Sequence, residues 1–140
     1  MTPQERAERS AEAMWVGDAA SQALGMKVLD VGPGRARLEM TVRADMVNGH
    51  STGHGGLTFA LADSAFAFAC NSYNRRTVAR VCQIRFRAPT RIGDVLVAEA
   101  VELERDDRDG RYDVSVRCGL EVVASFVGHS REVAGTHFDE

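Results

Sequence analysis

The sequence predicts one α+β domain, residues 1–140, in which a curved antiparallel sheet wraps around one long buried helix. Three observations support this fold class. Residues 57–73 are apolar on nearly every side, and the segment is too long for an ordinary strand. Two strand patterns precede it and four follow it. A chain of 140 residues has the size of a single domain, so these elements must share one core.

An additional helix is expected at the N-terminus. Residues 1–24 are charged at the start and then rich in Ala and Glu, and the segment stops at Gly25, a residue typical of helix ends. Gly17 and Asp18 interrupt the apolar stripe of this segment. We therefore expect a single helix that packs on the outside of the fold.

Six segments have the alternation that is typical of strands. In the second of them, Ala, Leu, Met and Val alternate with charged and hydroxyl side chains, as in a strand with one buried face. We expect the last four strands to form a meander. Residues 131–140 carry no core pattern and are expected to fray. The predicted strands cover residues 26–31, 36–43, 78–87, 95–103, 111–118 and 120–130.

Composition and charge exclude several classes of protein. The net charge of −3 gives no sign of a nucleic-acid partner, and no apolar segment is long enough to span a membrane. The start of the chain lacks the apolar stretch of a secretion signal. Three widely spaced cysteines are expected to be buried free thiols, which fits a cytoplasmic protein. They are Cys70, Cys82 and Cys118.

Asp63 is the most informative polar residue. Within residues 59–68 every neighbour except Ser64 is apolar. Burial without a partner is costly for a carboxylate and raises its pKa, and such carboxylates commonly act as acids, bases or nucleophiles. The alternative is a structural aspartate that is bonded to backbone amides or paired with an arginine.

Gly55 and Gly56 begin the buried helix. The first turn of a helix has free N–H groups and a partial positive charge, so a ligand's carbonyl oxygen could bind there as in an oxyanion hole. The alternative is a glycine pair that only permits a sharp turn. His54 and Asn48 lie in the polar loop before it, where such residues are usually solvated or caps. His50, His54 and Asp63 lack the spacing of a metal site, so no metal is expected.

These residues match a family. Residues 48–56, Asn-Gly-His-Ser-Thr-Gly-His-Gly-Gly, and residues 61–71, which contain Asp63, closely resemble the PaaI-type thioesterases of phenylacetic acid degradation. The resemblance runs from about residue 25 to residue 135. It includes the strand at 78–86 and the closing sequence Phe-Val-Gly-His-Ser at 126–130. The asparagine, the His-Gly-Gly and the aspartate at these intervals make a specific motif, which a lone His-Gly-Gly would not.

The resemblance implies a hot-dog fold and hydrolysis of aryl- and hydroxyphenylacetyl-coenzyme A without metal or redox cofactor. It implies that the N–H of Gly55 polarises the thioester carbonyl and that Asp63 activates or supplies the nucleophile. Asn48 and His54 would place water and the thioester, with Ser64 as a helper. Expected contacts to the acyl group or coenzyme A are Gly56, Phe66, Arg75, Arg76, Arg80 and Arg87.

One departure from the family is visible at residues 88–89. The family often has Arg-Pro after this strand, whereas this chain has Ala88-Pro89, so a phosphate contact must come from another residue such as Arg87. Two further functions stay open: a non-hydrolytic hot-dog enzyme such as an acyl-thioester dehydratase, and a domain that binds acyl-coenzyme A without turnover. A dehydratase pairs a histidine with an acidic residue in another arrangement.

A single sheet covers only one side of a central helix and leaves its edge strands open. Pairing of two chains through edge strands would extend the sheet and bury both helices. We therefore expect a homodimer. The family resemblance implies that two such dimers commonly assemble into a homotetramer.

Overall fold

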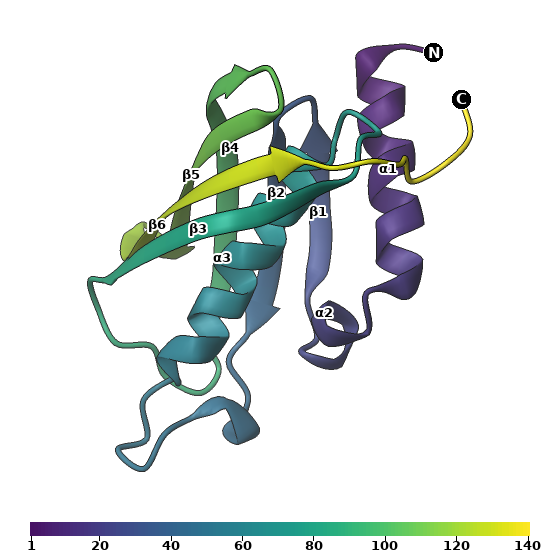
Figure 1. The fold of residues 1–140 in the computed structure, drawn as a ribbon. Helices are drawn as coiled ribbons and strands as arrows, with labels where there is room; N and C mark the ends of the chain where they lie inside the picture. Colours follow the sequence, from purple (N-terminus) through teal and green to yellow (C-terminus); the bar gives the residue numbers. More distant parts are fainter.

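Six strands form one antiparallel sheet in the computed structural model, which describes residues 1–140. The sheet curves around α3 (Gly55–Cys70), so the predicted α+β hot-dog architecture is confirmed (Figure 1). The other elements are α1 (Pro3–Gly17), α2 (Ala19–Ala23), β1 (Lys27–Gly32), β2 (Arg35–Thr41), η1 (Ala44–Met46), β3 (Thr77–Phe86), β4 (Val95–Asp106), β5 (Asp109–Cys118) and β6 (Glu121–Glu132).

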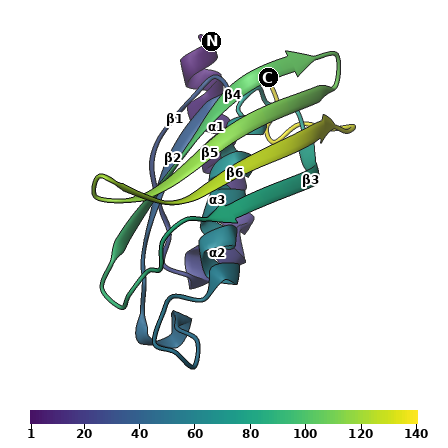
Figure 2. The ribbon, with the colours of Figure 1, turned by 90° about the vertical axis from the view of Figure 1, so that its left-hand side faces the viewer.

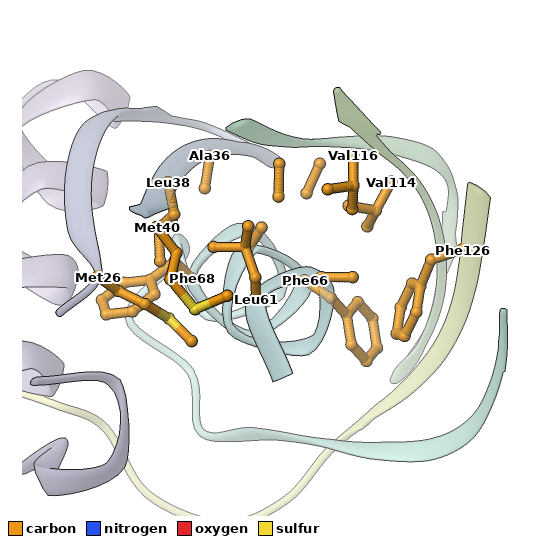
Figure 3. Close-up of a cluster of buried hydrophobic side chains, with 14 of the residues drawn as sticks. Met26, Ala36, Leu38, Met40, Leu61, Phe66, Phe68, Val114, Val116 and Phe126 are labelled. Atoms are coloured by element: carbon orange, nitrogen blue, oxygen red, sulfur yellow. The ribbon is translucent and has the colours of Figure 1, made fainter. Parts of the chain in front are cut away.

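The core lies between α3 and the concave face of the sheet. Leu61 and Phe66 of α3 are fully buried, and Phe66 packs against Phe126 of β6 with ring centroids 5.8 Å apart (Figure 3). Small alanines on β2 and β4 let the helix approach the sheet closely. The alternation predicted for the second strand is confirmed, since its buried side chains are Ala36, Leu38, Met40 and Val42.

The order of the strands differs from the expected meander. Of the last four strands, only β4, β5 and β6 follow one another in the sheet, and the full order is β1-β2-β4-β5-β6-β3 (Figure 2). β3 pairs with β6 at the sheet edge instead of with β4, because the other edge of β4 is occupied by β2. The strand that follows α3 in the chain is therefore an open edge, and most of its residues are exposed.

The expected N-terminal helix is two helices. α1 ends at Gly17, and the side chain of Asp18 accepts a hydrogen bond of 3.0 Å from the N–H of Ser21 to cap α2. Glycine and a capping aspartate in succession favour a break over a continuous helix. α1 packs against β1 at the outside of the sheet, as expected (Figure 1).

The cysteines are all free, and only Cys70 is buried. Burial raises the pKa of its thiol to about 12. Cys82 and Cys118 are half-buried, which corrects the expectation that all three are buried. None of the helices is long and apolar enough to cross a membrane.

The sequence predicts that residues 131–140 fray, and in the structure this C-terminal tail makes hydrogen bonds to the rest of the chain. β6 continues to Glu132, and the N–H of Val133 donates to the carbonyl of Arg76 at 2.7 Å. Asn74 then binds the tail with both ends of its amide: Oδ1 accepts from the N–H of His137 at 2.9 Å, and Nδ2 donates to the carbonyl of Phe138 at 3.0 Å. These are polar contacts, which explains why an apolar core pattern did not predict them.

Asn74→Ala should destabilise the protein by about 2–3 kcal/mol, because it removes buried hydrogen bonds and puts a Cβ without a polar group at a φ of 57°. Urea unfolding measures the loss. Asn74→Gly is the matched control, since it loses the same bonds without backbone strain and should cost less. Unchanged stability in both variants would show that the tail frays as the sequence suggested.

Candidate active site

The N-terminus of α3 presents one unpaired backbone donor. His54 caps the helix, because its Nδ1 accepts the N–H of Gly56 at 3.0 Å. Its own N–H donates to the carbonyl of Met46 at 2.7 Å. The N–H of Gly55, between them, has no hydrogen-bond partner within the chain. A carbonyl oxygen that approaches the helix end would find this donor together with the positive end of the helix dipole.

The capping bond also selects one tautomer of the neutral His54 ring. A ring nitrogen that accepts a hydrogen bond carries no proton, so the neutral imidazole has its proton on Nε2. The residue is exposed, which leaves this Nε2–H able to donate to a ligand or water. His54 therefore serves as a cap with a free donor on its outer side.

Asn48 shapes the loop that leads to the helix. Its Oδ1 accepts hydrogen bonds from the N–H of His50 at 2.9 Å and from the N–H and hydroxyl of Thr52 at 3.2 and 3.1 Å. The loop is closed by a β-bridge between Val47 and Gly53. The amide nitrogen of Asn48 makes no such bond within the chain and remains a donor for a ligand.

A pocket of about 330 Å³ opens beside this helix end. One wall is the ring of Phe86, at the end of β3, which lies so close to Gly55 that an added Cβ would be 3.0 Å from Cζ. Arg87 also lines the pocket, and its Nε donates to the hydroxyl of Ser125 at 2.7 Å. The lining includes Gly53, Gly55, Thr58, Phe86, Arg87 and Thr90.

Asp63 lies on the side of α3 that the sheet does not cover. It is half-buried, and no hydrogen bond or ion pair to its carboxylate is present within the chain. Burial raises the pKa of Asp63, and the charge of Asp18 raises it further. The structural alternative, an aspartate paired with an arginine or bonded to amides, therefore has no support in this chain. The carboxylate of Asp63 is therefore a stronger base than that of an ordinary aspartate.

Asp63 and Gly55 cannot act together within one chain. They are eight residues apart on one helix, which at 1.5 Å per residue separates them by about 12 Å. A carboxylate must come within roughly 3–3.5 Å of the reacting atoms, directly or through one water. Within one chain, the strand β3 at the sheet edge pairs only with β6 and its other side is open.

Ser64 contacts a second serine of the same chain. Its hydroxyl is 2.9 Å from the hydroxyl of Ser21, so it ties α3 to α2. This is a structural bond between two helices, and it accounts for a polar residue at this position without reference to a substrate.

Several expected substrate contacts lie elsewhere. Phe66 is 1% exposed and belongs to the core, because its ring fills the space beside Gly128 and packs on Tyr112, so it is not available to a substrate of this fold. Arg75, Arg76 and Arg80 follow the C-terminal end of α3 and do not line the pocket at Gly55.

Arg76 and Arg80 also have partners of their own. The Nε of Arg76 donates to the carbonyl of Thr136 at 3.1 Å, and Arg80 forms an ion pair of 3.5 Å with Asp109. Of the four arginines, only Arg87 lines the pocket. Gly56 is exposed in the first turn of α3 and does not line it.

The sequence pattern alone missed Phe86 and Thr90. Phe86 ends a strand whose apolar residues suggest core positions, yet 57% of its area is exposed. Thr90 lies in a turn and carries no motif. Their place beside Gly55 follows from the connection between β3 and β4, which passes the head of α3: the N–H of Gly53 donates to the carbonyl of Thr90 at 2.8 Å.

Comparisons with known proteins agree on one family. Residues 50–124 match the family model described as the thioesterase superfamily. The chain is 42% identical, over 94% of each sequence, to an Escherichia coli protein named acyl-coenzyme A thioesterase PaaI. The solved structure of the E. coli PaaI protein from the phenylacetic acid degradation operon matches with a TM-score of 0.94 and 40% identity, over 96% of this chain and 99% of that one.

A second solved structure extends the likeness to a thermophile. A mutant of the phenylacetic acid degradation protein PaaI from Thermus thermophilus is 40% identical, with a TM-score of 0.79. The match covers 81% of this chain and 97% of the Thermus chain. A relative that lacks the equivalent of about a fifth of this chain thus has the same fold.

Proposed function

Because the chain belongs to the thioesterase superfamily, we propose that it hydrolyses aromatic acyl-coenzyme A esters, such as phenylacetyl- or hydroxyphenylacetyl-coenzyme A, to the free acid and coenzyme A in phenylacetate catabolism. The observation that carries the proposal is that one helix, α3, has both an unpartnered carboxylate at Asp63 and a free N–H at Gly55. Both belong to the stretch of sequence shared with the E. coli relative.

The chemistry follows from these two groups. The thioester carbonyl accepts a hydrogen bond from the N–H of Gly55, which also stabilises the negative charge that develops on its oxygen. Asp63 removes a proton from a water that attacks the carbonyl carbon, or attacks it directly to give a mixed anhydride that water then cleaves. In either case the carbon–sulfur bond breaks and coenzyme A leaves as a thiolate. Asn48 and His54 supply donors from the loop.

The site needs two chains, and we include this in the proposal. Pairing of two open β3 edges would cover exposed apolar side chains such as Val78, Val81 and Phe86. It would also set the two α3 helices antiparallel, with Gly55 of one chain near Asp63 of the other. A dimer of such dimers, and a cytoplasmic location consistent with three free cysteines, complete the proposal.

Light scattering at micromolar concentration should give a mass of at least twice 15.2 kDa. The reason is that neither the uncovered face of α3 nor the β3 edge has a partner within one chain. An active species that scatters as a 15.2 kDa monomer would contradict the shared site.

The activity itself is tested with a panel of acyl-coenzyme A esters and a thiol-trapping dye. Release of free thiol from phenylacetyl-coenzyme A, with a higher kcat/KM than from aliphatic esters, is the expected result. Enoyl absorbance from a 3-hydroxyacyl ester would instead indicate a dehydratase. Tight binding without thiol release or enoyl formation would indicate a binding domain.

Removal of metal should leave this rate unchanged. No step in the proposed chemistry uses a metal or another cofactor, since Asp63 activates the nucleophile and Gly55 binds the oxyanion. The hydrolysis rate is compared before and after EDTA treatment and desalting. A large loss that a divalent ion restores would mean that residues such as His50, His54 and Asp63 bind a metal after all.

A further inference from the structure

Thr90 has a buried hydroxyl without a partner. The residue is 4% exposed, and its Oγ1 is the only buried side-chain nitrogen or oxygen in the chain that makes no hydrogen bond. Buried hydroxyls are normally paired, because an unpaired one has lost its hydrogen bonds to water without replacement. Such an exception calls for a specific explanation.

The backbone of Thr90 is hydrogen-bonded to the loop that precedes α3. Its carbonyl accepts the N–H of Gly53 at 2.8 Å, and its hydroxyl lies where a side chain of residue 53 would begin, so that any Cβ there would overlap Oγ1. Only glycine fits at position 53 while Thr90 keeps this place. The hydrogen bond thus keeps the backbone of Thr90 beside the loop that leads into α3, and the hydroxyl lies against Gly53.

The pocket that Thr90 lines also contains the free N–H of Gly55. Two residues with unpaired polar groups therefore line one volume of about 330 Å³: Gly55 with a donor, and Thr90 with a hydroxyl that can donate or accept. The hydroxyl of Thr90 lies against Gly53. Gly53 is two residues from Gly55, so the Cα atoms of these two glycines are at most about 7 Å apart.

This spacing fits one feature of a coenzyme A thioester. The nearest polar group to its carbonyl is the amide of the pantetheine arm, whose nitrogen is four bonds away, or about 5–6 Å when extended. With the carbonyl oxygen on the N–H of Gly55, that amide comes within reach of Thr90. The next amide of the arm is too far away to be reached from the same pose.

We propose that the hydroxyl of Thr90 binds the pantetheine amide next to the thioester, so that Thr90 recognises the thiol half of the substrate. The inference rests on the proposed function and adds a binding residue to it. Rotation of Thr90 about its Cα–Cβ bond to another staggered position turns the hydroxyl from Gly53 toward the pocket. No hydrogen bond is lost in this rotation, because the hydroxyl makes none within the chain.

The test compares two thioesters of phenylacetic acid: the N-acetylcysteamine thioester, which keeps this amide, and the butyl thioester, which lacks it. Thr90→Val keeps the shape and removes the hydroxyl, and Thr90→Ser keeps the hydroxyl. Thr136→Val, a threonine in the tail, is the matched control for the substitution. Circular dichroism and thermal unfolding establish that all variants are folded.

Thr90→Val should lower kcat/KM about fivefold to tenfold for the N-acetylcysteamine thioester, as for the loss of one hydrogen bond, and less than twofold for the butyl thioester. Thr90→Ser should restore most of the loss. An equal loss on both thioesters, or no loss on either, would overturn the proposal.

A binding measurement separates this inference from the proposed function. A ketone analogue of phenylacetyl-coenzyme A, in which a methylene replaces the thioester sulfur, keeps the four bonds between carbonyl and amide but cannot be hydrolysed, and calorimetry should show a weakening of about fivefold to tenfold in Thr90→Val. A wild-type chain that binds the ketone but hydrolyses no thioester would contradict the proposed function, while the affinity of Thr90→Val still decides the role of Thr90. Equal affinity in wild type and Thr90→Val would refute it.

Discussion

Asp63→Asn should lower kcat by about 10²–10⁴-fold and leave the chain folded, because it keeps the shape of the side chain and removes the base or nucleophile. The carboxylate makes no hydrogen bond or ion pair within the chain, so the substitution removes no stabilising contact. Steady-state kinetics with phenylacetyl-coenzyme A and thermal unfolding measure the two effects. Unfolding of the variant at room temperature would show that the aspartate is structural.

The pH dependence provides a second readout for Asp63. Its pKa is raised by burial and by Asp18, and the ionised form is the active one. We therefore expect kcat/KM to fall as the pH drops through a value above the usual range of an aspartate, and this limb should be absent from the residual activity of Asp63→Asn. A wild-type rate that holds down to the ordinary aspartate range, about pH 3.9, would contradict the assignment.

The same shift predicts the sign of the stability effect. The folded chain binds the Asp63 proton more tightly than the unfolded chain, so the stability that this proton contributes is present below the unfolded pKa. It is lost as the pH rises through the raised, folded pKa. Above that pH the buried charge weakens the fold, and Asp63→Asn should be at least as stable as the wild type at neutral pH.

A mixed dimer should recover about half the wild-type activity from two nearly inactive parents. One parent carries Asp63→Asn and the other Gly55→Pro, because proline removes the N–H yet is tolerated in the first turn of a helix. If each site combines Gly55 of one chain with Asp63 of the other, the heterodimer contains one intact site and one that is doubly defective. Differently tagged subunits are purified as the heterodimer and assayed per dimer.

The position of Phe86 requires a control for the proline. Any Cβ at residue 55 would lie 3.0–3.1 Å from the ring of Phe86, so Gly55→Pro changes the packing as well as the donor. Gly55→Ala introduces the same Cβ and keeps the N–H. If the donor matters, Gly55→Ala should retain far more activity than Gly55→Pro. If Gly55→Pro misfolds, Asn48→Ala replaces it. A folded heterodimer with activity near zero would place the whole site within one chain.

Much of the architecture could be predicted from local patterns. The apolar segment around Asp63 predicted the central helix, because no other element of that length is apolar on nearly every side, and the alternation at residues 36–42 predicted which face of β2 is buried. The break at Gly17 and Asp18 was visible as an interruption, but a single sequence does not show whether a helix passes through it. The order of the strands could not be predicted, since β3 could form similar hydrogen bonds beside β4 or beside β6.

For the candidate site, the chemical groups could be identified in the sequence: the isolated carboxylate of Asp63, the glycine donor at the head of its helix and the loop that contains Asn48 and His54. Which other residues lie near them became clear in the folded chain. The fold placed Phe66 in the core, left three of the four arginines at the far end of α3, and brought Phe86 and Thr90 to Gly55. The physical reason is that chemical type and helical spacing are local properties of the chain, whereas these contacts depend on how the connection between β3 and β4 passes the helix, which is a property of the whole sheet.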